Sequence, residues 1–134
     1  NVAERLSMYQ EMDNLKTEEE LQQFTDHLID RFGPLPRQVK ELMISFRLRW
    51  MAEKMGLERL VIKSGKMIGY FIADPQSPFY ETETFTQVLN YIQRNVKGCK
   101  LSEKNDRLRI IFEDVKHIND AYEQLTGVTV EVKI

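Results

Sequence analysis

Apolar residues recur every three or four positions along the first part of the chain, which is the spacing of one face of an α-helix. Three helices are predicted, over residues 2–14, 17–32 and 35–55. The apolar face of the first carries Val2, Leu6, Tyr9 and Met12, and the buried stripe of the second carries Leu21, Phe24, Leu28 and Phe32. Thr17-Glu18-Glu19-Glu20 has the residues of a capping box, which predicts that the second helix begins there.

Residues 30–36 separate the second helix from the third. Gly33 suits the left-handed conformation that ends a helix, Pro34 cannot continue one, and Pro36 suits the first turn of the next. Asp30 does not fit this account. A carboxylate in the last turn of a helix meets the negative end of the helix dipole and is unfavourable by about 0.3–1 kcal/mol. We therefore expect Asp30 to have another role.

The third helix is predicted to be apolar on two opposite faces. At 100° per residue, one face gathers Val39, Leu42, Met43, Phe46 and Trp50, and the other gathers Ile44, Leu48, Met51 and Met55. A helix that is apolar on two faces is covered on two faces. The pattern predicts a central spine, with the first two helices on one side and the rest of the domain on the other.

After Gly56 the pattern changes to that of strands. Two apolar segments, 59–63 and 67–73, flank Ser64-Gly65-Lys66 and predict a β-hairpin. The further predicted elements are a helix that begins at Thr82 or Thr84, strands at 99–102 and 107–112, a helix from Asp114 to Gly127, and a closing strand at 128–132.

The predicted order is α-α-α-β-β-α-β-β-α-β, which indicates an α+β fold: N-terminal helices, then a small, largely antiparallel sheet with helices on one face. The 134 residues are expected to form a single domain, with a helical part at 1–56 and an α/β part at 57–134. Because the chain enters a helical pattern at once, we expect it to be a piece of a larger protein.

Composition excludes several classes of function. The formal net charge is −2, so no overall basic field favours nucleic acid. The single cysteine, Cys99, allows no internal disulfide and suits a reducing, cytoplasmic setting. No apolar run has the length of a membrane span, and no membrane contact is expected.

The sequence contains no recognisable active site. His27 and His117 are 90 residues apart without the spacing of a metal site, and Cys99 has no neighbouring base. Ser64-Gly65-Lys66 lacks the upstream glycine and the downstream helix of a phosphate loop. No catalytic residue, no metal ligand and no cofactor are therefore predicted in this chain.

One segment carries a local excess of positive charge. Between positions 94 and 109 there are six basic and two acidic residues. The basic side chains are Arg94, Lys97, Lys100, Lys104, Arg107 and Arg109. The segment lacks the aromatic platform of a single-strand-binding surface, but it supports a second hypothesis, an accessory domain that contacts nucleic-acid phosphates.

Several stretches of the first half resemble one known family. They are Glu4-Arg5-Leu6-Ser7-Met8-Tyr9, Thr17-Glu18-Glu19-Glu20-Leu21, Leu28-Ile29-Asp30-Arg31-Phe32-Gly33-Pro34-Leu35-Pro36, Arg47-Leu48-Arg49 and Met55-Gly56-Leu57. They resemble the C-terminal domain of transcription-repair coupling factors. The resemblance is dense over residues 2–62, and beyond them only the order of elements agrees.

This resemblance implies a non-catalytic regulatory fragment from the C-terminus of a bacterial, ATP-driven translocase of duplex DNA. That parent protein displaces stalled RNA polymerase and recruits nucleotide excision repair. Its ATP and magnesium belong to motor domains outside this chain. In the family, the C-terminal domain folds back on the UvrB-like N-terminal module of the same chain and covers the surface that binds UvrA. The expected role is therefore autoinhibition.

The resemblance also places a contact at the end of the second helix. Asp30 matches an acidic position that faces basic side chains of the UvrB-like module, and His27 and Arg31 lie beside it. The family favours Glu where this chain has His27, which implies a weaker or a pH-dependent set of ion pairs. A local alternative for Asp30 stays open, in which its carboxylate accepts amide hydrogens from the start of the third helix.

Overall fold

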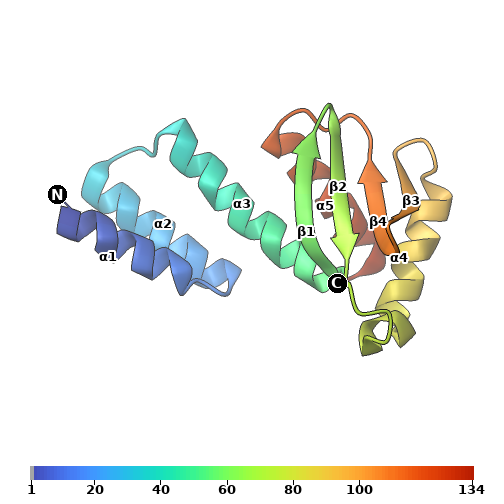
Figure 1. The fold of residues 1–134 in the computed structure, drawn as a ribbon. Helices are drawn as coiled ribbons and strands as arrows, with labels where there is room; N and C mark the ends of the chain where they lie inside the picture. The colour runs from blue at the N-terminus through green and yellow to red at the C-terminus, as the bar shows by residue number, and fades with distance from the viewer. Residues whose placement is uncertain (1) are drawn as a thin grey trace. The chain divides into compact units, whose positions relative to one another are not determined.

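The computed structural model describes residues 2–134, apart from the side chain of Arg5, and over this range it forms five α-helices, one 3-10 helix and four strands (Figure 1). The elements are α1 (Val2–Asp13), α2 (Glu18–Phe32), α3 (Arg37–Lys54), β1 (Leu57–Lys63), β2 (Lys66–Phe71), η1 (Pro78–Glu81), α4 (Glu83–Arg94), β3 (Cys99–Lys104), β4 (Arg107–Phe112) and α5 (Ile118–Val132). The chain divides into two compact units, Asn1–Met43 and Ile44–Ile134, and the division falls inside α3. The two units are described separately.

The ends of α2 confirm the predicted signals. The Thr17 side chain accepts a hydrogen bond from the amide of Glu20 at 3.1 Å, which satisfies a donor in the first turn. Gly33 has a φ of 83° and donates its amide to the carbonyl of Ile29 at 2.8 Å. Glycine adopts this conformation without the steric cost of a Cβ, so the helix ends there.

The core of the N-terminal unit is small. Its buried apolar side chains are Leu15, Leu21, Phe24, Leu28 and Met43. Phe32 was predicted to extend the buried stripe of α2, and that prediction is wrong, because the side chain is 55% exposed. Phe32 is the last residue of α2, and its ring lies 5.3 Å from the guanidinium carbon of Arg31 rather than in the core.

The C-terminal unit is built on a four-stranded antiparallel sheet with the strand order β1-β2-β4-β3. Ser64 and Gly65 both have positive φ in the turn between β1 and β2, as do Asn105 and Asp106 between β3 and β4. Positive φ at both central residues is the geometry that two-residue hairpins favour, since its twist matches that of the strands. The predicted β-hairpin is confirmed, and the two further predicted strands pair with each other in a second hairpin.

One face of this sheet is covered by helices. The core joins the last part of α3 (Leu48, Ala52, Met55), α4 (Val88, Tyr91, Ile92) and α5 (Ala121, Leu125, Val128, Val132) to the strands. From the strands come Leu57, Met67, Phe71, Cys99, Ile110 and Phe112. Figure 1 shows α4 and α5 against the sheet. The predicted α+β class, with helices on one face, is confirmed.

The connection from β2 to α4 packs through a cluster of aromatic rings. Phe79 and Tyr80 of η1 form edge-to-face contacts with Phe85, at centroid distances of 5.5 and 5.0 Å. Gly56, which follows the last turn of α3, has a φ of 80°, and a Cβ there would come within 2.2 Å of the Phe79 ring. This position therefore needs glycine both for its conformation and for its space.

The predicted closing strand at 128–132 is wrong, because α5 continues without a break to Val132. Gly127 has no positive φ and does not end the helix, which ends instead at Lys133 with a φ of 64°. The buried residues Ala121, Leu125, Val128 and Val132 follow helical spacing, so burial along one helix face outweighs the β-branched composition of the last turn.

Gly127→Ala is predicted to stabilise the chain by about 0.5–1 kcal/mol, because Gly127 sits in a helix interior where alanine loses less conformational freedom on folding. A Cβ there would meet only the Tyr91 hydroxyl at 3.4 Å. Urea unfolding measures the change. Gly65→Ala is the control, since its φ of 75° makes alanine unfavourable, by about 1–2 kcal/mol. Equal destabilisation by both variants would contradict the helical assignment of Gly127.

Asp120→Asn is predicted to remove a pH-dependent part of the stability. The Asp120 carboxylate accepts the amides of Lys116 and His117 at 3.0 and 3.1 Å, which hold the pKa of Asp120 below its usual value of 3.8. A lowered folded-state pKa stabilises the chain above the unfolded pKa, and this contribution is lost as pH falls through the folded pKa. Unfolding measured over a pH series should show the two chains differing most above about pH 5 and converging in acid.

Candidate functional site

An apolar groove runs along the N-terminal unit between α1, the end of α2 and the start of α3. It has a volume of about 430 Å³, and its lining is apolar except for Glu4. Several of its side chains remain open to solvent although they are large: Tyr9 is 52% exposed, Phe32 is 55% and Leu42 is 38%. Val2 and Leu6 on α1 are also exposed, at 71% and 56%. An apolar surface on this scale marks an interaction site more often than an ordinary solvent face.

The three residues predicted to bind a partner lie at the C-terminal end of α2, and only two of them share a groove. His27 and Arg31 line a second hollow of about 240 Å³ between α1 and α2, whereas Asp30 lines neither groove. Arg31 forms an ion pair with Glu4 of α1. Arg31 therefore contributes to the packing of α2 on α1, and His27 and Asp30 remain on the exposed surface.

The Asp30 carboxylate accepts no hydrogen bond and forms no ion pair with any residue that the structure describes. At the start of α3, the amides of Val39 and Lys40 donate hydrogen bonds to the carbonyl of Pro36, at 3.1 Å each, and not to Asp30. The local alternative, in which Asp30 caps the start of α3, is therefore not present. The charge stays unfavourable for its own helix and is exposed for a partner.

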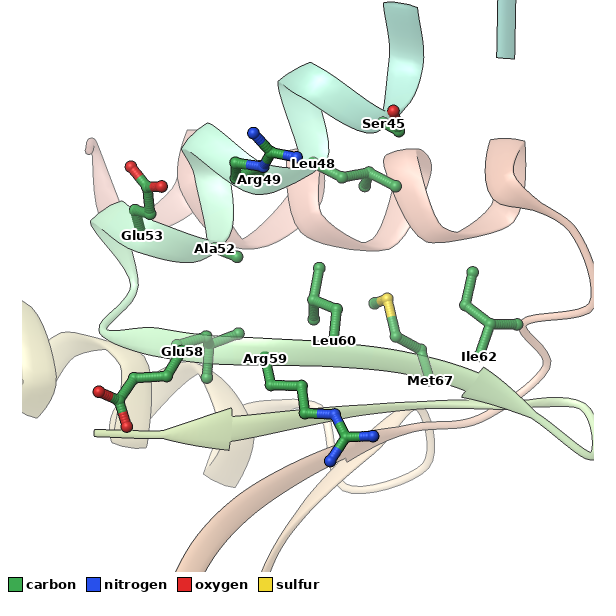
Figure 2. Close-up of a pocket in the computed structure, with 11 residues that line it drawn as sticks. Ser45, Leu48, Arg49, Ala52, Glu53, Glu58, Arg59, Leu60, Ile62 and Met67 are labelled. Atoms are coloured by element: carbon green, nitrogen blue, oxygen red, sulfur yellow. The ribbon is translucent and has the colours of Figure 1, made fainter. Parts of the chain in front are cut away.

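A third groove lies in the C-terminal unit between α3 and β1 (Figure 2), with a volume of about 490 Å³. Figure 2 shows Leu60, Met67 and Ile62 pointing toward α3, and Arg59 pointing away from it across the sheet. Glu58 at the rim is already engaged, because it accepts the amide of Ala73 at 2.7 Å and pairs with Arg107 at 2.8 Å. No set of reacting groups converges in this groove.

The basic segment 94–109 does not form one surface. Arg94, on α4, donates to Glu131 of α5 at 3.0 and 2.6 Å, so its charge is paired on the helical side. Lys97 lies in the turn before β3. The other four residues, Lys100, Lys104, Arg107 and Arg109, share the sheet face that the helices leave open.

Sequence reasoning missed the neighbours of these four residues. Antiparallel pairing places Tyr70 beside Arg109 and Arg59 beside Tyr70, and the alternation of β1 and β2 adds Lys63 and Lys66. The sequence did contain one signal for these neighbours, which is the alternation of side chains between the two faces along the predicted hairpin. It becomes informative only when the order of the four strands is known, since these residues come from distant parts of the chain.

Groups suited to catalysis are not assembled in the described part of the chain. Burial raises the pKa of the Cys99 thiol to about 11, so it is a protonated core group near neutral pH. No cluster of three or more His, Cys, Asp or Glu side chains with metal-binding geometry occurs among residues 2–134 with described side chains. Within the same range, no helix is long and apolar enough to span a membrane.

Comparison with known proteins gives a consistent family. The family model described as the TRCF domain matches residues 1–82. The transcription-repair-coupling factor of Escherichia coli (strain K12) is 43% identical over 60 residues, which cover 45% of this chain and 5% of that protein. That of Rickettsia prowazekii (strain Madrid E) is 28% identical over 129 residues, which cover 96% of this chain and 11% of that protein.

A solved crystal structure, that of the C-terminal domain of transcription-repair coupling factor, has the same fold. It superposes with a TM-score of 0.71 at 20% identity, over 98% of this chain and 78% of that chain. The match to the two curated relatives spans only 5% and 11% of their lengths, so this chain corresponds to a small part of proteins of that kind.

Proposed function

The chain belongs to the TRCF domain family, and we propose that it acts as an autoinhibitory domain of a transcription-repair coupling factor. In this proposal it binds the UvrB-like module of its own chain and covers the surface through which that module would bind UvrA. The parent protein would be a cytoplasmic translocase of duplex DNA that uses ATP and magnesium and acts on stalled RNA polymerase. Those activities would reside outside this domain, which contributes regulation and no catalysis.

The observation that carries the proposal is the exposed, unpartnered carboxylate of Asp30 at the C-terminal end of α2. A charge that disfavours its own helix and has no local partner is compensated if a cationic side chain of another module reaches it. His27, three residues earlier, lies on the same side of α2 and would sit at the margin of that contact.

The charge and exposed apolar area of the N-terminal unit support the same role. Residues 1–43 contain nine acidic and five basic side chains, so this part of the chain suits a basic partner surface. The rings of Tyr9 and Phe32 are also exposed. They provide the apolar centre of an interface, and charged residues such as Asp30 would form its polar rim. Such an arrangement is typical of intramolecular interfaces that open and close.

Asp30→Ala in the full-length parent protein is predicted to increase UvrA binding by about tenfold, because loss of one interfacial ion pair worth about 1.4 kcal/mol shifts the closed form toward the open form. Titration with UvrA measures the affinity. The same substitution should leave the unfolding of this 134-residue chain unchanged, or stabilise it by at most about 1 kcal/mol through relief of the dipole.

Asp13→Ala is the matched control. Asp13 is also an exposed carboxylate in the last turn of a helix, α1, so its removal relieves the same kind of charge–dipole repulsion. UvrA affinity should not respond to it. If both variants raise UvrA affinity equally, or if Asp30→Ala unfolds the chain and leaves UvrA binding unchanged, the autoinhibitory role of Asp30 is wrong.

A further inference from the structure

Among the described residues of the C-terminal unit, the helices pack on one face of the sheet, and the other face is here called the open face. Strand pairing defines it, because the side chains of directly paired residues point to the same side of a sheet. Three positions from each of the four strands contribute, and seven of the twelve are Lys or Arg while none is acidic. These cations are Arg59 and Lys63 of β1, Lys66 of β2, Lys100 and Lys104 of β3, and Arg107 and Arg109 of β4.

The open face is positively charged, whereas the chain as a whole has a net negative charge. The sequence has 19 basic and 21 acidic residues, so with seven cations on the open face the remainder has 12 basic and 21 acidic. A random scatter of 19 basic residues over 134 positions would place about two of them among any twelve, whereas the open face has seven. The open face is thus a positively charged patch on an otherwise acidic chain, the kind of surface that attracts polyanions.

Most of these cations are not neutralised within the chain. Arg107 pairs with Glu58 at 2.8 Å and Lys66 with Glu113 at 3.5 Å, and both acids lie at the margins of the open face. The other five cations have no acidic partner among the residues that the structure describes. Arg109 is held toward β3 by a hydrogen bond of 2.9 Å from its guanidinium to the Ser102 hydroxyl.

The centre of the open face is aromatic and apolar. Tyr70 lies on the inner strand β2, and the guanidinium carbons of Arg59 and Arg107 are 5.5 and 5.7 Å from its ring centroid. Val61 and Ile68 beside it are half-buried. Lysines occupy the two edge strands, β1 and β3, which are separated by three strand spacings of about 4.8 Å, or about 14 Å in total.

We propose that the open face binds single-stranded nucleic acid. Lys63, Lys100 and Lys104 on the edge strands contact phosphates, and an unpaired base stacks at the centre on Tyr70 or on the guanidinium planes beside it. A duplex hides its bases and offers only phosphates to a flat surface, so it would leave Tyr70, Val61 and Ile68 without a role. The carboxylates of an acidic peptide would pair with the cations but carry no aromatic ring to stack on the arginine–tyrosine cluster.

Fluorescence anisotropy of the 134-residue chain tests this with three probes: a labelled 20-nucleotide oligothymidylate, its duplex with oligodeoxyadenylate, and labelled polyglutamate. The single strand should bind most tightly. Its affinity should fall with salt at a slope of about −0.7 for each phosphate contacted. Tyr70→Leu should weaken single-strand binding at least about fivefold while leaving that slope unchanged.

Lys100→Gln with Lys104→Gln should weaken binding and reduce the salt slope by about 1.4, the value for two lost phosphate contacts. Both side chains are exposed on an edge strand, so this variant should fold normally, which circular dichroism checks for it and for Tyr70→Leu. Lys54→Gln with Lys133→Gln is the matched control. It removes the same total charge from the ends of α3 and α5, which pack on the other face.

The proposal is overturned by equal binding of duplex and single strand with Tyr70→Leu silent, which indicates a surface for phosphates alone. Tighter binding of polyglutamate indicates an acidic protein partner instead. An effect of the control pair as large as that of the β3 pair indicates general charge attraction. Absence of any binding at low salt leaves the open face without a polyanion ligand.

Discussion

The sheet of the C-terminal unit is stabilised from one side only, because α4, α5 and the end of α3 all pack on the same face. Side chains alternate along a strand, so burying Met67, Phe71, Ile110 and Phe112 commits the residues between them to the other face. A register slip of one residue would bring Arg107 and Arg109 into the core, where unpaired charges are strongly unfavourable. The apolar core and the cationic open face are therefore specified by the same alternation.

The N-terminal unit has a different limitation, which is the small size of its core. Helix α2 is well anchored by Leu21, Phe24 and Leu28, yet α1 keeps Leu6 and Tyr9 exposed, and the last turn of α2 keeps Phe32 exposed. A short helical unit cannot bury all of its apolar surface. The surface that remains open, together with the unpartnered carboxylate of Asp30, is what makes this unit suitable for reversible contact with another module.

Local signals predicted most of the fold correctly, because helix ends and hairpin turns depend on a few adjacent residues. Thr17, Gly33, Gly56 and Gly65 each act within their own turn. The end of α5 was mistaken because Val128, Val130 and Val132 fit the period of a strand, while Ala121, Leu125, Val128 and Val132 fit that of a helix. Only packing decides between the two periods. The open face was missed because its residues come from four strands whose order is not written in any local pattern.

The two proposed surfaces differ in the sign of their charge, which limits what salt can show about either. Residues 1–43 have a net charge of −4 and residues 44–134 a net charge of +2. Raising ionic strength weakens an ion pair at Asp30 and a phosphate contact at Lys100 alike, since both rest on exposed charges. Salt sensitivity of the parent protein would therefore not assign its regulation to either surface. Substitutions can make this assignment if each removes charge of one sign from one unit. Each needs a control that removes the same charge elsewhere in that unit. Such pairs separate a contact with a protein module from a contact with nucleic acid.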